Sequence, residues 1–174
     1  SLEAWGTGIK ACLYFPTRAG QQLSVRVAVS GTGTDGALRN LAEIEGKDFD
    51  TVRREAEALW EAELGRYELD PACSRKDKET FYTSVYRTAL HPFLFQDVDG
   101  RFRAHDGTIG QASGFTNYTT FSLWDTYRAF HPLLNLVNQT LQADLANSML
   151  EHYDKSTEHM LPIWSFYGGE TWCM

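Results

Sequence analysis

The sequence predicts a mainly α-helical protein that begins with a short β segment, and two patterns carry that prediction. Apolar and polar residues alternate from Leu23 to Val29, which is the two-residue period of a half-buried strand. From Asp48 onward, apolar residues recur at spacings of three and four, the period of an amphipathic helix. We therefore expect a β edge followed by helices in antiparallel succession, with a long irregular insertion before the third helix.

Two strands are expected near the start of the chain. The first covers about residues 10–15 and is closed by Pro16 and the turn near Gly20. The second is the alternating segment over residues 23–29. Together they predict a hairpin that belongs to a β domain whose remainder lies upstream. Several glycines follow this segment and separate it from the helices.

Four helices are expected after the glycines. The first begins at Asp48, which supplies the N-cap, and ends at Gly65. The second runs from about residue 75 to 90, where a following proline disfavours helix in the residue before it. Two more are predicted over roughly residues 124–137 and 140–152.

The insertion over residues 93–120 reads as turns and short strands. Asp97–Gly100 and Asp106–Gly107 are typical of hairpin turns. Spaced aspartates also occur in calcium-binding EF-hand loops, which need a glycine at the sixth position and a glutamate at the twelfth. Here the glycine is fourth and the twelfth residue is Thr108. A polar hairpin is the better interpretation.

Charge and composition argue against several functions. The 16 basic and 23 acidic residues leave a formal net charge of −7, which disfavours nucleic acid or an anionic membrane as the main partner. No apolar run approaches the roughly 20 residues of a membrane-spanning helix, so no membrane insertion is expected. The three cysteines lie far apart and the five histidines lack metal-ligand spacing, so neither predicts a disulfide framework or a zinc site.

The strongest candidate binding motif lies where the third helix is expected to begin. Trp124 can cover the apolar face of a sugar ring, while Asp125 and Arg128 can reach its hydroxyls. A structural alternative remains open. The Ser122 hydroxyl would accept a hydrogen bond from the N–H of Asp125 in a capping box, and Asp125 would pair with Arg128 along the helix.

Glu170 is a second candidate because of its unusual neighbours. It follows two glycines, which bring backbone close to a ligand, and aromatic residues flank it on both sides. Aromatic walls disfavour the charged form of a carboxylate and can fit it for general-acid work. The alternative is that Glu170 accepts backbone hydrogen bonds in a loop beside core aromatics.

Four ordered motifs add a family resemblance. They are FYTSVYRTALHP at residues 81–92, DVDG at 97–100, YTTFSLWDTYRAFHPLL at 118–134, and LPIW followed by ETWCM at 161–174. Their residues and their order resemble the motifs of glycoside hydrolase family ninety-two, the calcium-dependent exo-acting α-mannosidases. The similarity covers most of residues 25–174.

The resemblance implies a fold. Family members have an N-terminal β-sandwich, linking helices and an (α/α)6 barrel. Residues 1–33 would be the end of the sandwich domain, and residues 34–174 the linking helices and the first part of the barrel, truncated at Met174. The chain is therefore expected to be an internal fragment of a longer protein.

The resemblance also implies an activity. The full-length parent would remove terminal α-linked mannose, with α-1,2 linkages favoured, by inversion and with calcium as cofactor. Asp125 and Arg128 would bind hydroxyls of the terminal mannose, and Trp124 would form a wall of this sugar subsite. Glu170 would lie close to the same subsite. The general acid, the general base and most of the calcium environment would lie beyond Met174, so this chain alone would be inactive.

Partners and location follow by the same resemblance. The partners would be mannose-containing glycans, and the protein would be secreted, periplasmic or on the cell surface. Two other functions remain open: another (α/α)-barrel carbohydrate enzyme, such as a glucosidase or phosphorylase, and a non-catalytic helical module. Calcium dependence and mannose selectivity would separate the first of these from a mannosidase.

Overall fold

A computed structural model describes residues 5–170 of the chain. The helices within this range are α1 (Thr34–Leu41), the short 3-10 helix η1 (Ala42–Ile44), α2 (Phe49–Leu64), α3 (Arg75–Thr88), α4 (Leu123–Thr126), α5 (Phe130–Val137) and α6 (Gln139–Lys155). The strands are β1 (Phe93–Leu94), β2 (Arg101–Arg103), β3 (Ile109–Gln111), β4 (Tyr118–Thr119), β5 (Ser165–Phe166) and β6 (Gly169–Glu170). The predicted mainly α class is confirmed for this part of the chain.

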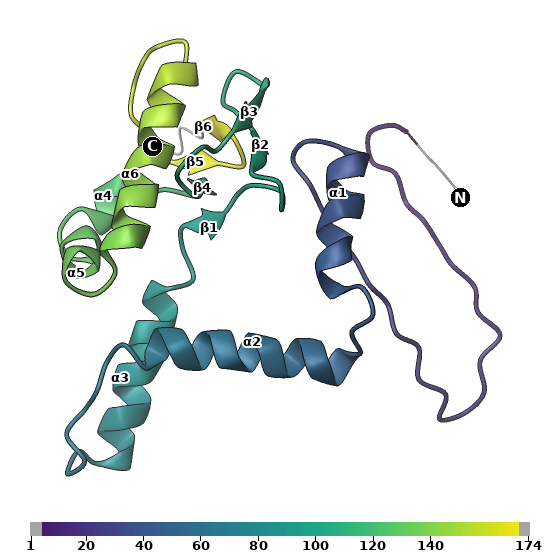
Figure 1. The fold of residues 1–174 in the computed structure, drawn as a ribbon, viewed down its shortest axis with the longest axis horizontal. Coiled ribbons are helices and arrows are strands. Elements are labelled where there is room, and N and C mark those ends of the chain that lie inside the picture. Colours follow the sequence, from purple (N-terminus) through teal and green to yellow (C-terminus); the bar gives the residue numbers. More distant parts are fainter. Residues whose placement is uncertain (1–4, 171–174) are drawn as a thin grey trace.

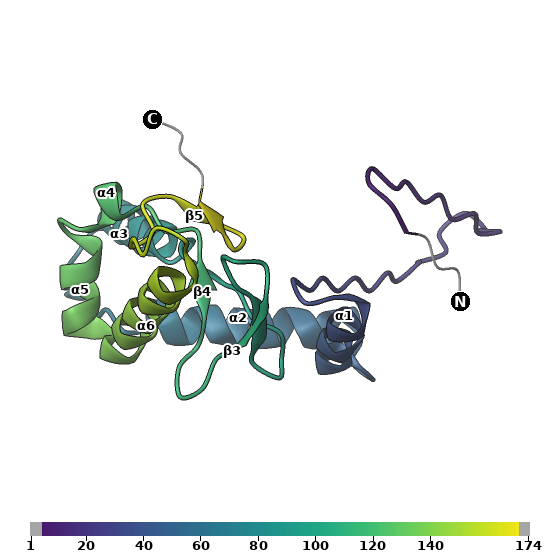
Figure 2. The same ribbon diagram turned by 90° about the horizontal axis from the view of Figure 1, so that it is seen from above.

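The elements are spread along an elongated molecule. The extended N-terminal segment and α1 lie at one end, and α4–α6 with the strand pairs lie at the other (Figure 1). The long helix α2 runs between the two ends, and α3 folds back against it. The view from above shows the same order, with α4, α5 and α6 at the end away from the N-terminal segment (Figure 2). No helix among residues 5–170 has both the length and the apolar character needed to cross a bilayer.

The predicted hairpin over residues 10–29 is wrong as a local structure. The chain is extended there but forms no strand, and Val25, Val27 and Val29 are between 73% and 81% exposed. A lone two-stranded hairpin is at best marginally stable in water, and no other element among residues 5–170 covers this apolar row. The alternating pattern marks a strand that needs a sheet to join. The assignment of residues 1–33 to a β-sandwich stays a prediction.

The first two predicted helices are confirmed, and so is the Asp48 cap that starts the first of them. The Asp48 carboxylate accepts the backbone N–H of Thr51 at 2.7 Å, and α2 ends where Gly65 follows. The Ser74 hydroxyl accepts the N–H of Asp77 at 3.2 Å at the start of α3. Both caps satisfy backbone donors that have no partner inside the helix. These boundaries follow from local chemistry.

The third predicted helix, over residues 124–137, is wrong because it is two helices. Residues 127–129 separate α4 from α5, and Ala129 leaves the helical conformation with φ −130°. Pro132 explains the break: it lacks an N–H, and its ring conflicts with the carbonyl of residue 128 in a continuous helix. The fourth helix is confirmed as α6, started by the Asn138 side chain, which accepts the N–H of Leu141 at 3.2 Å.

The insertion forms two antiparallel strand pairs, as expected from its turn residues. β2 and β3 make a hairpin around Asp106–Gly107, and β1 pairs with β4 so that Phe93 lies opposite Thr119. Asp97 and Gly100 close a tight turn through a 2.8 Å backbone hydrogen bond. This turn leads into β2, but β1 and β2 pair with other strands, so the hairpin interpretation is confirmed for Asp106–Gly107 and only the turn is confirmed for Asp97–Gly100.

A small apolar core holds the C-terminal half together. Phe121, Leu134 and Leu145 are its buried centre, and half-buried side chains pack around them: Tyr118, Phe130, Leu141 and Met149. Phe121 belongs to this core and is followed directly by the residues that begin α4. The core therefore anchors the segment that presents Trp124, Asp125 and Arg128.

A buried carboxylate joins the segment before α1 to the insertion. Asp97 is 3% exposed and accepts hydrogen bonds from the Ser30 hydroxyl at 2.8 Å, the Asn40 amide at 2.8 Å and the Thr32 hydroxyl. Burial raises the pKa of Asp97, but the hydrogen bonds from Thr32, Asn40 and Ser30, together with nearby Arg39, outweigh it and lower the pKa below its usual value. The acid is therefore ionised at neutral pH and ties residues 30–40 to the insertion.

Candidate functional site

The first turn of α4 presents the predicted sugar-binding groups to solvent. Trp124 is 67% exposed, and Asp125 and Arg128 are also exposed. The Arg128 guanidinium lies 5.9 Å from the centre of the Tyr127 ring rather than against Asp125. No ion pair joins Asp125 to Arg128 within the described range, so that part of the structural alternative is wrong. Both charged groups remain available for a ligand.

The predicted capping box at Ser122 is also wrong. The N–H of Asp125 bonds to the Ser122 carbonyl at 3.0 Å, and the Ser122 hydroxyl instead donates to the Asp125 carboxylate. The same hydroxyl accepts the indole N–H of Trp164 at 2.8 Å. Thr120, just upstream, has φ 68°, an uncommon conformation for a β-branched residue. This bend redirects the chain from β4 toward α4.

Glu170 faces inward from β6. One carboxylate oxygen, Oε1, accepts the backbone N–H groups of Trp164 at 2.5 Å and Ile163 at 3.2 Å. The Glu170 side chain is only 12% exposed. The structural alternative, in which Glu170 accepts backbone hydrogen bonds in its loop, is thus confirmed. A role for Glu170 beside a sugar subsite stays a prediction.

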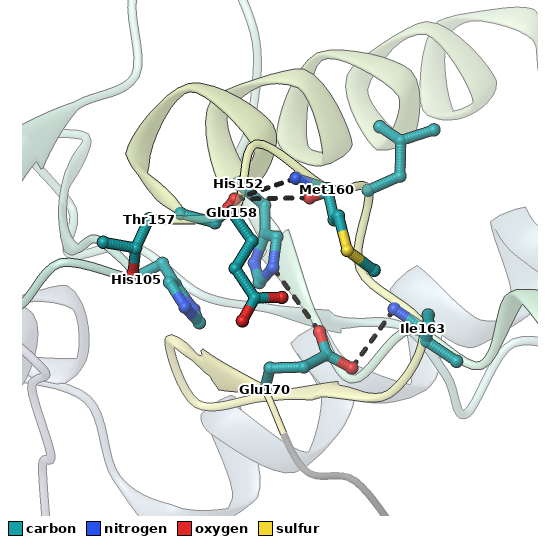
Figure 3. A pocket seen from close by; sticks show the side chains of 9 residues that line it. His105, His152, Thr157, Glu158, Met160, Ile163 and Glu170 are labelled. Carbon is teal, nitrogen blue, oxygen red and sulfur yellow. Dashed lines mark hydrogen bonds and ion pairs between the residues drawn. The ribbon is translucent and has the colours of Figure 1, made fainter.

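A small cavity of about 90 Å³ opens beside Glu170, at the end of α6 (Figure 3). Three titratable side chains contact one another there: His105 from the loop between β2 and β3, His152 from α6, and Glu170; a fourth, Glu158, also lines the cavity. His152 Nε2 lies 3.4 Å from Glu170 Oε2, and the rings of His105 and His152 are 4.5 Å apart. Sequence reasoning missed this cluster, because its members come from three separate elements and no spacing links them.

The described residues do not fit a calcium site. Among residues 5–170, no group of three or more histidine, cysteine, aspartate or glutamate side chains is placed to hold a metal ion. Calcium takes six to eight oxygen ligands, and neither the Asp97–Gly100 turn nor the Glu170 cavity supplies such a set. The calcium implied by the family resemblance has no ligand set among these residues.

Burial controls the protonation of His152. Removal from water, together with the neighbouring His105, lowers the pKa of His152 from 6.5 to about 4. The nearer oxygen of Glu170, Oε2, receives no hydrogen bond from the described residues. Because its pKa lies well below 7, His152 is neutral at pH 7.

This pKa predicts a loss of stability in acid. As the pH falls below 6.5, the unfolded chain binds a proton at His152 that the folded chain does not bind until about pH 4. The free energy of unfolding should therefore fall over this window, with a slope of at most about 1.4 kcal/mol per pH unit for one proton. Thermal unfolding of the full-length protein from pH 7 to 4.5 should show this slope, and His152→Gln should reduce it. Identical slopes in both proteins would contradict the assignment.

Comparisons with known proteins define the class of this chain. Residues 36–174 match the model of the glycosyl hydrolase family 92 catalytic domain. The chain therefore belongs to glycosyl hydrolase family 92, which confirms the resemblance drawn from its four motifs.

Individual relatives agree with this assignment. A family GH92 alpha-mannosidase from Bacteroides thetaiotaomicron, also solved in complex with mannoimidazole, is 64% identical over 83% of this chain with a TM-score of 0.80. An uncharacterized secreted glycosidase from Arthroderma benhamiae is 30% identical over 128 residues, or 69% of this chain. The chain spans 19% of the bacterial structure and 16% of the fungal relative.

Proposed function

We propose that the full-length protein hydrolyses terminal α-linked mannose and that this chain supplies part of its sugar-binding surface. The observation that carries the proposal is the 64% identity to an alpha-mannosidase whose structure was also determined with mannoimidazole. Family membership over residues 36–174 supports it. The exposed Trp124, Asp125 and Arg128 suit a ligand that presents both an apolar ring face and hydroxyls.

Each group has a distinct role in this proposal. The Trp124 ring covers an apolar face of the terminal mannose, as its 67% exposure allows. Asp125 accepts hydrogen bonds from sugar hydroxyls, and Arg128 donates to hydroxyl oxygens. Glu170 shapes the neighbouring loop through its bonds to Ile163 and Trp164, and lies near the same subsite.

The chemistry itself belongs to the rest of the protein. We propose hydrolysis by inversion, which needs a general acid and a general base roughly 6.5–9.5 Å apart to admit a water molecule. Both groups, and the ligands of a calcium ion, would lie outside residues 5–170. This chain alone would then release no mannose. We further propose a preference for α-1,2 linkages.

The proposed partners are mannose-containing glycans, and the proposed location is outside the cytoplasm. The fungal relative is called a secreted glycosidase, which supports that location. A glucosidase or phosphorylase, and a non-catalytic module, remain the competing functions that the following experiment separates.

The test is mannose release from an α-1,2-linked mannobiose, measured with calcium and with a chelator. The full-length protein and the 174-residue chain are compared side by side. We expect calcium-dependent release by the full-length protein alone. Release by the short chain would place the catalytic pair inside it. No release from this substrate or other α-mannosides by either protein would overturn the mannosidase proposal.

A further inference from the structure

A line of hydrogen bonds connects the exposed Asp125 to the interior. The backbone N–H of Trp164 donates to the largely buried Glu170 carboxylate at 2.5 Å, which fixes the loop before β5. The indole N–H of Trp164 then donates to the Ser122 hydroxyl oxygen at 2.8 Å. Ser122 in turn donates to Asp125 Oδ2. Two segments that are far apart in the sequence thereby meet at the first turn of α4.

Chemistry sets the direction of each bond in this line. An indole nitrogen can only donate, so the Ser122 oxygen is the acceptor from Trp164. The single hydroxyl proton of Ser122 is then left for Asp125, and an ionised carboxylate only accepts. The line therefore occupies Oδ2 of Asp125. No donor among residues 5–170 bonds to its other oxygen, Oδ1.

Helix capping does not account for this arrangement. In a capping box the serine hydroxyl would accept the N–H of Asp125, but that N–H bonds to the Ser122 carbonyl at 3.0 Å. The hydroxyl is turned instead toward the carboxylate, and its second partner, Trp164, is 42 residues away. α4 has only four residues, so orienting one carboxylate contributes little to its stability.

We infer that Ser122 and Trp164 are positioning residues that aim the free oxygen of Asp125 at a sugar hydroxyl. The inference rests on the proposed function, in which Asp125 binds the substrate. An exposed carboxylate rotates freely, and binding must stop that rotation at an entropic cost. Because Ser122 already holds one oxygen, the other is oriented before the sugar arrives.

A double-mutant cycle in the full-length protein tests the inference. Mannose release is measured for wild type, Ser122→Ala, Asp125→Asn and the double variant. We expect Ser122→Ala to lower kcat/KM about tenfold in the wild-type background and less than about twofold in the Asp125→Asn background. Trp164→Phe, which removes the indole N–H and keeps a six-membered aromatic ring, should show the same dependence on Asp125. Ser122→Thr keeps the hydroxyl and should retain most activity.

The outcomes separate this inference from the function on which it rests. A tenfold loss from Ser122→Ala in both backgrounds would show a merely structural role and overturn the inference. Full activity of Ser122→Ala, with reduced activity of Asp125→Asn, would overturn the inference and leave the proposed function standing. No mannose release by the wild type would overturn both. If Ser122→Ala does not fold, the cycle between Trp164→Phe and Asp125→Asn gives the same decision.

Discussion

Replacing Asp125 by alanine in the full-length protein should lower kcat/KM for mannose release about 100-fold. The exposed carboxylate has one oxygen held by Ser122, and the other is proposed to accept a sugar hydroxyl. A hydrogen bond to a charged group contributes about 1.5–3 kcal/mol, and each 1.36 kcal/mol corresponds to a factor of ten in rate. Steady-state kinetics on an α-mannoside, with thermal unfolding as a check on folding, provides the measurement.

Asp35→Ala is the matched control for Asp125→Ala. Asp35 is also an exposed carboxylate in the first turn of a helix, but that helix is α1, at the other end of the molecule. We expect Asp35→Ala to leave kcat/KM within about twofold of wild type, because substitutions on an exposed surface rarely have larger effects. If Asp125→Ala is as active as Asp35→Ala, Asp125 does not bind the substrate.

Replacing Asp97 by alanine should destabilise the protein by about 2–4 kcal/mol. The substitution leaves the Asn40 amide and the Ser30 and Thr32 hydroxyls without their shared acceptor at a buried site. The fit is also tight, since a Cβ on Gly36 would lie 2.4 Å from Asp97 Oδ2. We expect a lower thermal midpoint and faster proteolysis within residues 31–47.

The pH dependence of the Asp97 contribution gives a second readout. Because the folded pKa of Asp97 is lowered, its contribution is fully present above its unfolded pKa, near 3.9. The contribution is lost as the pH falls through the lower folded value, when the folded protein takes up the proton. The wild type and Asp97→Ala should therefore differ most at neutral pH and converge in strong acid.

Asp99→Ala is the control for the Asp97 variant. Asp99 lies in the same turn, and its half-exposed carboxylate pairs with Arg39 at 3.1 Å and Arg101 at 2.9 Å. Ion pairs at the surface contribute about 0–1 kcal/mol, so this variant should lose much less stability. Equal losses from the two variants would mean that the turn as a whole, rather than the buried carboxylate, joins residues 30–40 to the insertion.

The parts of the fold that depend on neighbouring residues could be predicted from the sequence. Asp48 and Ser74 start their helices because each side chain accepts a backbone N–H three residues away. Asp106–Gly107 turns a hairpin for a similarly local reason. The motif around Trp124 and Asp125 also identified the family, since residue order alone carries that information.

Parts that depend on distant partners required the tertiary structure. The alternating row from Leu23 to Val29 has the period of a strand, yet it forms none without a sheet beside it. The break before α5 could have been predicted from the sequence, because Pro132 cannot continue a helix from the residues before it. The apolar spacing over residues 124–137 favoured one continuous helix instead.

The sequence by itself determined the family, the helix boundaries set by caps, and the residues that present an aromatic ring, a carboxylate and a guanidinium together. Only the tertiary structure decided that Ser122 donates to Asp125, because the competing bond comes from Trp164, 42 residues away. It also decided that Glu170 faces inward beside His152. Caps act over three or four residues and leave a local pattern, whereas these contacts exist only where separate elements pack together.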